Sequence, residues 1–306
     1  MSETYKHAPP PELVKHVTAI CGHRGEEWLE RLPVVVADLE EHWDVTAQAP
    51  FEKGEFNFVA PVRSSQGKDA VLKIAPPYER TEIFAEARFL RSRDGTGCVR
   101  LLAENRLAHA ILLERSMPGY SMDVHFNVDP FACVEPAIGV LKSILHPPPS
   151  EAGDVQFLDD WFVRFRRFRE SNFPQPYGER ALSIYERLSV QHDRIFYLHG
   201  DFHPGNIVTS DRSNFLAIDP KGLVGHLTYD IAVFLNNLLW WQQGKLGLAS
   251  ALRSAVTKFS RSFGISEPKI KEAAYAYMVI SSWWNFEEMP EHYNEAEIAM
   301  ADIWDL

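Results

Sequence analysis

The chain has 306 residues, of which 45% are hydrophobic and 24% charged, a composition typical of a folded globular protein. Its length suits one large domain or two lobes that share a cleft. The formal net charge of −11 disfavours a nucleic-acid or anionic-membrane partner, because such partners require basic patches. The acidic balance would suit a cationic substrate, although solubility is its simplest explanation.

The cysteines and the apolar segments predict a cytoplasmic protein with no membrane partner. Cys21, Cys98 and Cys133 have no CxxC spacing, so we expect reduced thiols and neither a disulfide framework nor a zinc site. The longest apolar stretch, Ile231 to Trp241, is short and contains two asparagines. The first eleven residues lack the apolar core of a secretion signal.

The first part of the chain changes from helical to strand periodicity. Residues Gly25 to Trp43 predict an amphipathic helix, with Pro33 marking a kink or a break. Apolar runs over Glu55–Val62 and Ala70–Ile74 flank a glycine-containing loop and predict a β-hairpin. A helix over Tyr78–Arg93 and strands over Val99–Leu102 and Ala110–Glu114 are expected next, before the break at Met117-Pro118-Gly119.

The second part is predicted to be mainly helical. A short strand, Ile195–Leu198, leads into the polar run HGDFHPGN, and a hairpin over Ile207–Ile218 follows. From Tyr229 onward only helices are expected. We therefore divide the chain into residues 1–117, with a helical prelude over 11–45, and residues 118–306. Earlier helices are predicted over Pro130–Leu145, Phe157–Arg169 and Gly178–Leu188.

The run HGDFHPGN carries the residue types that phosphoryl transfer requires. Asp201 and Asn206 lie five positions apart in a tight loop after a strand, and Asp219 ends the next hairpin. Their oxygens are of the kind that Mg²⁺ prefers. The spacing matches the protein-kinase pattern of an Asp, an Asn and a metal-binding Asp.

HGDFHPGN, together with LAIDPKGLVGHLTYDIA, resembles the aminoglycoside phosphotransferase family, and within it the branch of streptomycin 6-kinases and hydroxyurea-resistance kinases. WLERLPVVVADLEEHW, FNFVAPV, AVLKIA and LLERSMPG also resemble that branch in order and spacing. The resemblance covers about residues 28 to 240. It implies an α+β, protein-kinase-like, two-lobed fold, with a small mixed sheet lobe followed by a mainly helical lobe.

The resemblance also implies roles for the residues of the polar loop. Asp201 matches the family's catalytic aspartate, while Asn206 and Asp219 match its metal ligands. The implied cofactors are Mg²⁺ and ATP or GTP as phosphoryl donor. Lys221, two residues beyond Asp219, either neutralises γ-phosphate charge or reaches solvent.

In the first lobe the resemblance implies a nucleotide site. Lys73 matches the strand lysine that contacts phosphates, and Glu86 matches the helix glutamate that holds this lysine, with Glu82 as the rival. Residues Glu114 to Met117, including Ser116, match the linker whose backbone receives the adenine. The turn Glu52–Asn57 departs from the GxGxxG of protein kinases because it has a single glycine.

Several neighbouring residues have two interpretations. His199 is expected to brace the loop rather than take part in the chemistry, and His203 either touches substrate or packs within the loop. Asp230 either caps a helix or holds the catalytic loop's backbone; both roles are non-catalytic. The arginines of 164–169 are most simply a solvated basic face.

The acceptor pocket is the least determined feature. The aromatic run from Trp283 either lines it or belongs to the core. For a polycationic acceptor we expect carboxylates outside the metal site, with Glu287 and Glu288 as candidates and Glu291 nearby.

We therefore predict a small-molecule kinase, a monomer or weak dimer, with an aminoglycoside-type antibiotic such as streptomycin as the expected acceptor. A sugar, an amino alcohol or hydroxyurea would also suit the site, because a fold does not select the acceptor. A nucleotide-binding pseudoenzyme and a metallohydrolase built on His199, Asp201, His203 and Asp219 are the competing hypotheses. A protein kinase is disfavoured, because the segment from Asp219 to Asp230 is short and lacks APE.

Overall fold

The structure is a computed structural model that describes residues 8–52, 54, 56–78, 82–150, 155–190, 195–242, 244, 247–288, 293 and 295–305, without the side chains of Glu288 and Glu295. It divides into two compact units, Met1–Gly119 and Tyr120–Leu306, which are described separately. Within the described ranges no helix has the length and apolar character needed to span a bilayer.

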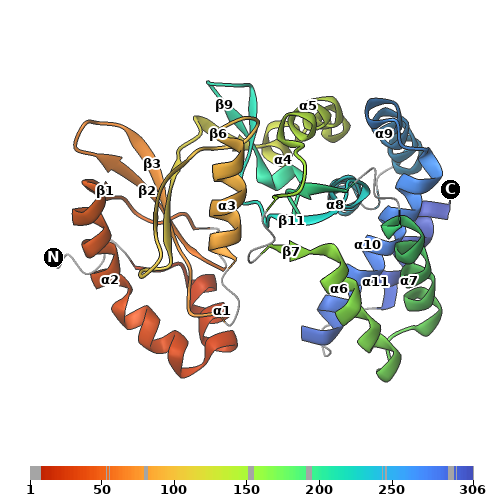
Figure 1. The fold of residues 1–306 in the computed structure, drawn as a ribbon, viewed down its shortest axis with the longest axis horizontal. Coiled ribbons are helices and arrows are strands. Elements are labelled where there is room, and N and C mark those ends of the chain that lie inside the picture. The colour runs from red at the N-terminus through yellow and green to blue at the C-terminus, as the bar shows by residue number, and fades with distance from the viewer. Residues whose placement is uncertain are drawn as a thin grey trace. The chain divides into compact units, whose positions relative to one another are not determined.

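Two helices open the first unit (Figure 1). Helix α1 covers Pro11–Cys21, and α2 runs from His23 to Trp43 as one helix that contains Pro33. Of the kink or break expected at Pro33, the break is therefore wrong, because the helix continues through this residue. Gly25 lies where α1 and α2 come close, because a Cβ on it would stand 2.5 Å from the carbonyl oxygen of Val17. Any larger residue at this position would push the helices apart.

A five-stranded antiparallel sheet forms the centre of this unit, in the order β1-β2-β3-β5-β4. One face packs against α2 through Leu32, Val36 and Leu39. Side chains alternate along a strand, so Leu72 on β3 faces this core and its neighbour Lys73 faces the other way. The strands are β1 (Val45–Ala47), β2 (Phe58–Ser64), β3 (Asp69–Ile74), β4 (Leu101–Asn105) and β5 (Ala110–Glu114).

Helix α3 (Ile83–Arg93) lies against the opposite face of the sheet (Figure 1). The helix expected from Tyr78 begins later, and residues 79–81 are outside the described part. Strand β4 starts two residues later than expected, because the backbone N–H of Arg100 donates instead to the Glu114 carboxylate at 2.9 Å. The β4–β5 register also shifts between Leu101 and Ala103.

The second unit is mainly helical, with two three-stranded sheets ordered β10-β9-β6 and β7-β11-β8. Strands β6, β7 and β11 were not predicted, because their two to four residues do not form an apolar run of the kind that marks β8. The strands are β6 (Pro118–Ser121), β7 (Gln156–Phe157), β8 (Ile195–Leu198), β9 (Ile207–Ser210), β10 (Phe215–Ala217) and β11 (Leu223–His226). The α-helices are α4 (Met122–His125), α5 (Val134–Ile144), α6 (Leu158–Phe165), α7 (Gln175–Ser189), α8 (Thr228–Trp241), α9 (Leu248–Phe263), α10 (Glu267–Glu288) and α11 (Glu295–Ala299). The 3-10 helices are η2 (Pro130–Cys133), η3 (Arg166–Glu170), η5 (Pro204–Asn206) and η7 (Met300–Asp305).

An aromatic cluster forms part of this unit's core. Trp283 on α10 is 3% exposed, and its ring centroid lies 5.3 Å from that of Phe173 and 5.5 Å from that of Phe286. Phe165 on α6 joins them at 6.3 Å from Trp283. Trp283 is therefore a core residue, which decides between the two interpretations of this tryptophan.

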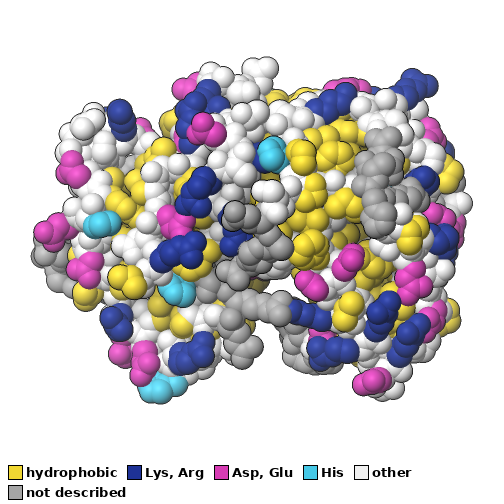
Figure 2. All heavy atoms as spheres, in the orientation of Figure 1, with side chains coloured by type: hydrophobic (Ala, Val, Ile, Leu, Met, Phe, Trp, Pro, Cys, Tyr) yellow, Lys and Arg dark blue, Asp and Glu magenta, His cyan; other side chains and the backbone are white. Residues whose placement is uncertain are grey.

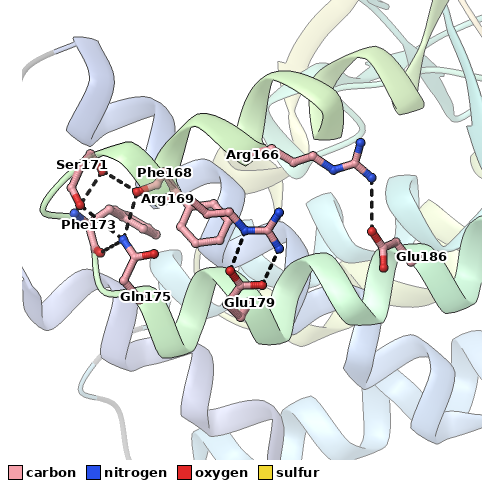
Figure 3. Close-up of polar contacts among 8 residues, drawn as sticks. All are labelled: Arg166, Phe168, Arg169, Ser171, Phe173, Gln175, Glu179 and Glu186. Atoms are coloured by element: carbon pink, nitrogen blue, oxygen red, sulfur yellow. Dashed lines mark hydrogen bonds and ion pairs between the residues drawn. The ribbon is translucent and has the colours of Figure 1, made fainter.

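Two arginines of η3, just after α6, are held by acids on α7, as Figure 3 shows. Arg169 donates two hydrogen bonds of 2.6 Å to Glu179, and Arg166 pairs with Glu186 at 3.1 Å. The amide of Gln175 closes the turn between these helices by donating to the carbonyls of Phe168, Ser171 and Phe173. This face is exposed, as expected, and the charges of Arg166 and Arg169 on it are paired with α7.

The burial of Trp283 gives a test of the core. We expect Trp283→Ala to lower the free energy of unfolding of this unit by about 3–5 kcal/mol, the usual loss for a buried aromatic residue. The control is Trp240→Ala, which removes a tryptophan that is 38% exposed and should cost less than about 1 kcal/mol. Urea unfolding followed by circular dichroism measures both, and equal losses would contradict the assignment of Trp283 to the core.

Candidate active site

The polar loop of residues 199–206 begins where strand β8 ends and closes through η5 into strand β9. Gly200 has a φ of +81°, and a Cβ on it would stand 2.4 Å from the side chain of Leu223 on β11. The position therefore requires glycine for its backbone angle and for the close approach of the neighbouring strand. This turn directs the next residue, Asp201, out of the sheet.

Asp230, on the first turn of α8, fixes the start of this loop. Its carboxylate accepts the backbone N–H of His199 at 2.9 Å and that of Gly200 at 2.8 Å. The residue is 1% exposed, and burial raises its pKa to about 7, while the two N–H donors favour the ionised form. Of the two interpretations of Asp230, the structure shows the one in which it holds the loop's backbone.

His199 braces the same loop from the inside. Its Nδ1 accepts the backbone N–H of Asp201 at 3.2 Å, so Nε2 carries the proton and donates to the carbonyl of Ile218 at 2.9 Å. Burial lowers the pKa of this histidine to about 4, so the ring is neutral at pH 7. With both ring nitrogens engaged, His199 has no lone pair left for a metal.

Asp201 and Asn206 are in direct contact. The Asn206 amide donates to the carbonyl oxygen of Asp201 at 3.0 Å and to its Oδ2 at 3.3 Å. The Asp201 side chain is 33% exposed, so a substrate can reach it. Because the NH₂ of Asn206 faces Asp201, its Oδ1 points away as a possible metal ligand.

Asp219 lies in the turn after β10 and has a φ of +59°. Backbone hydrogen bonds tie this turn to the loop on both sides of Asp219. Ile218 N–H donates to Asn206 O at 2.9 Å, and Lys221 N–H donates to His199 O at 2.7 Å. The structure therefore brings Asp201, Asn206 and Asp219 into one region of the second unit.

This donor set fits Mg²⁺. Asp219 is exposed and supplies carboxylate oxygens, and Asn206 supplies a neutral oxygen; both are hard ligands of the kind that this ion takes. Among the described residues no group of three or more His, Cys, Asp or Glu side chains is placed to hold a metal by itself. Mg²⁺ commonly binds through one or two protein groups and completes its shell with phosphate and water.

Lys73 and Glu86 form an ion pair in the first unit. Lys73 Nζ on β3 lies 2.6 Å from Glu86 Oε2 on α3, and the two residues are 5% and 3% exposed. Glu82, the rival, is exposed just before α3 begins. A buried pair of this kind has little room to rearrange, so Glu86 fixes the position of the ammonium.

At the end of β5 the Glu114 side chain is engaged by Arg100. The carboxylate accepts Arg100 N–H at 2.9 Å, and the Glu114 N–H donates to Arg100 O at 2.9 Å. Ser116 follows, partly exposed, in the segment expected to receive adenine. In the turn expected over phosphate, Lys53 and Glu55 lie outside the described residues.

Comparison with known proteins identifies the family. The aminoglycoside/hydroxyurea antibiotic resistance kinase family matches residues 42–288, which is most of the chain and includes every residue of the candidate site. The chain belongs to this family. It is therefore a small-molecule phosphotransferase, and the expectation drawn from its motifs is confirmed.

Two curated relatives are similar over nearly the whole of this kinase. The hydroxyurea phosphotransferase of Kitasatospora aureofaciens is 28% identical, over 96% of this chain and 85% of the relative. The streptomycin 6-kinase of Streptomyces glaucescens is 26% identical, over 95% of both chains.

Solved structures confirm the protein-kinase-like fold. A choline kinase from Streptococcus pneumoniae is similar with a TM-score of 0.62 and 12% identity, over 90% of this chain and 98% of that one. An amicoumacin kinase, solved with AMP-PNP and Ca²⁺, gives a TM-score of 0.61 and 16% identity, over 89% and 93% of the two chains. At these identities the likeness shows the fold and not the acceptor.

Two expected acceptor contacts of this kinase have protein partners. His203 Nδ1 accepts the N–H of Gly205 at 3.1 Å, and its Nε2 lies 3.9 Å from Asp201 Oδ1. Glu287 Oε1 pairs with Arg167 at 2.9 Å, so an ammonium group would have to displace a guanidinium there. The side chain of Glu288, and the whole of Glu291, lie outside the described part.

Sequence analysis of this kinase missed Trp161. The Trp161 ring on α6 lies edge-on to that of Trp284, with the two ring centroids 5.2 Å apart. The ammonium of Lys221 lies 5.9 Å from the centroid of the Trp161 ring. A tryptophan within a helical pattern indicates core packing. No sequence signal connects it to a lysine in a distant loop.

The neutral His199 predicts a pH effect on stability. Its pKa is about 4 when folded and about 6.5 in an unfolded chain, so below pH 6.5 the unfolded chain binds more protons. We expect the contribution of His199 to stability to fall by about 3 kcal/mol in total as the pH is lowered from about 6.5 to about 4. Asp230, with its raised pKa, contributes in the opposite direction over this range.

A comparison of wild type with His199→Gln isolates the histidine, because Asp230 is present in both. The measurement is urea unfolding at several pH values between 7 and 4. The stability advantage of wild type over the variant should shrink as the pH falls. An advantage that stays constant would mean that the pKa of this histidine is the same in the folded and the unfolded chain.

Proposed function

We propose that this kinase transfers the γ-phosphoryl group of ATP or GTP to a hydroxyl of an aminoglycoside-type antibiotic, with streptomycin as the first candidate. The observation that carries the proposal is the Asp201–Asn206 contact, on a loop held by Asp230, in a chain whose family includes such kinases. The resemblance to a streptomycin 6-kinase along almost the full length supports this acceptor.

Asp201 would orient the acceptor hydroxyl and take its proton. Its backbone is held by His199 and its side chain by Asn206, so the carboxylate has little freedom to turn away. A third of the side chain is exposed, which leaves an oxygen accessible to the acceptor. Positioning of this kind is the main protein contribution to phosphoryl transfer, because the reaction needs little covalent chemistry from the enzyme.

Asn206 and Asp219 would hold Mg²⁺, and when bound this ion neutralises charge on the phosphates. The Asn206 amide orientation, set by its two bonds to Asp201, turns Oδ1 outward for this purpose. Lys221, whose backbone is tied to His199, would supply a second positive charge for the γ-phosphate.

The first lobe, residues 1–117, would bind the nucleotide, and residues 118–306 would supply catalysis and acceptor binding. Lys73, fixed by Glu86, would contact the α- and β-phosphates. The backbone of Glu114 and Ser116 would receive the base.

Hydroxyurea is a second candidate, favoured by the hydroxyurea phosphotransferase that matches 96% of this chain. The two candidates differ in charge, because streptomycin is cationic and hydroxyurea is neutral. On the face drawn in Figure 2, acidic and basic side chains are interspersed, so the net charge of −11 does not form one acidic field there. For acceptor recognition we look to individual contacts, and His203, whose Nε2 lies 3.9 Å from Asp201 Oδ1, is the first candidate.

The first experiment measures ADP release with streptomycin, hydroxyurea and a panel of sugars and amino alcohols, and identifies the phosphorylated product by mass. We expect turnover with streptomycin and a KM for it that rises with salt, because charge attraction is screened. Salt-independent turnover of hydroxyurea alone would establish the second candidate. No turnover with any hydroxylated acceptor would contradict the proposed function.

The same assay tests Asp201. We expect Asp201→Asn to lower kcat by at least about 100-fold, the usual scale for a lost catalytic base, while AMP-PNP affinity stays within about twofold. The control is Asp211→Asn, which changes an exposed aspartate in the turn between β9 and β10 and should leave both quantities unchanged. Turnover at the wild-type rate in Asp201→Asn would move the role to another group, and His203 is the first to test.

The two metal ligands should respond differently to Mg²⁺. Asp219→Ala removes a charged ligand, so nucleotide binding and turnover should both collapse and remain low at high Mg²⁺. Asn206→Ala removes a neutral ligand, and raised Mg²⁺ should restore metal occupancy. The restoration of turnover should be incomplete, because Asn206 also holds Asp201. Better rescue of Asp219→Ala than of Asn206→Ala, in a titration of Mg²⁺ at fixed nucleotide, would reverse the ligand assignment.

A further inference from the structure

A lysine of the catalytic region lies over an aromatic ring from another element. Lys221 Nζ is 5.9 Å from the ring centroid of Trp161. The lysine belongs to the loop after Asp219, where its backbone N–H donates to His199 O at 2.7 Å. The tryptophan belongs to helix α6. The backbone of Lys221 is thus held by the catalytic loop, while the Trp161 ring contacts its ammonium group.

The ring is itself held in place. Trp284 on α10 packs edge-on against Trp161 at 5.2 Å and 81°, and Tyr229 on α8 does so at 5.8 Å and 79°. The indole N–H donates to Gln156 Oε1 at 3.4 Å. These contacts come from three different elements, so the plane of the Trp161 ring is fixed independently of Lys221.

An aromatic ring orients an ammonium group without cancelling its charge. The face of an indole attracts a cation within about 6 Å through its quadrupole, but the ring has no formal charge. A lysine held over a ring therefore loses part of the freedom of its four-carbon chain before an anion arrives.

We propose that Trp161 is a positioning residue that holds the Lys221 ammonium in place for the γ-phosphate of the nucleotide. The proposal rests on the proposed function, which gives Lys221 its phosphate contact. It goes beyond that function in naming a residue that acts only through Lys221. Preorganisation of a cation in this way lowers the cost of ordering it during phosphoryl transfer.

A double-mutant cycle tests whether the two residues act together. The variants are Trp161→Leu, Lys221→Gln and the two combined, and the readout is calorimetric affinity for AMP-PNP and for ADP, each with Mg²⁺. We expect each single change to weaken AMP-PNP binding by about threefold to tenfold and ADP binding by less than about twofold. The combined variant should bind AMP-PNP no more weakly than Lys221→Gln alone, because the ring acts through the lysine.

Two further variants keep the test independent of folding. Trp161→Phe retains an aromatic face and should retain most of the AMP-PNP affinity. Phe263→Leu breaks a similar pair elsewhere in the unit, in which Lys142 Nζ lies 5.7 Å from the Phe263 centroid, and should leave both affinities unchanged. A thermal unfolding curve for each variant shows whether Trp161→Leu is folded.

Three results would overturn the proposal. The first is additive losses in the combined variant, and the second is an equal loss of ADP and AMP-PNP affinity in Trp161→Leu. The third is an acceptor KM that Trp161→Leu raises equally in the wild-type and the Lys221→Gln backgrounds. That result would make the ring an acceptor contact. Failure of the proposed function is distinguishable, because it would appear as absent turnover in wild type while the binding cycle is unaffected.

Discussion

Two backbone N–H groups of the polar loop donate to the single buried carboxylate of Asp230, and the position of Asp201 depends on this interaction. Without an acceptor, both N–H groups would be buried and unsatisfied, at a cost of about 1–3 kcal/mol each. The helix that carries Asp230 is buried along most of its length, so it provides a firm anchor. The loop thus takes its geometry from the core of the second unit.

His199 and Asn206, the other residues that hold the loop, each form hydrogen bonds to more than one segment. His199 uses one ring nitrogen for Asp201 and the other for Ile218, so a neutral side chain joins the loop to the turn that carries Asp219. The backbone carbonyl oxygen of Asn206 accepts the N–H of Ile218 in the same turn. The catalytic and metal-binding candidates are therefore held together by the neutral ring of His199 and by backbone hydrogen bonds.

Local motifs allowed much of this site to be predicted. HGDFHPGN identified Asp201 and Asn206 because the two residues act within one tight loop, and β8 was predicted with its observed bounds because it is a short apolar run before that loop. The strand β11 and the Trp161–Lys221 contact were not predictable, since they depend on tertiary packing of distant segments. Glu287 looked available because its partner, Arg167, lies on another helix.

Side chains alternate between the two faces of the sheet along strand β3, so this short segment contributes both to the core and to the Lys73–Glu86 ion pair. Leu72 packs into the core against α2, while its neighbour Lys73 pairs with Glu86 on the far side of the sheet. A deletion or insertion of one residue here would exchange the faces, placing an ammonium in the apolar core and a leucine beside Glu86. This strand is therefore intolerant of length change, although the loops around it are free to vary. Sequence drift in such a kinase should leave the spacing between Ala70 and Ile74 untouched.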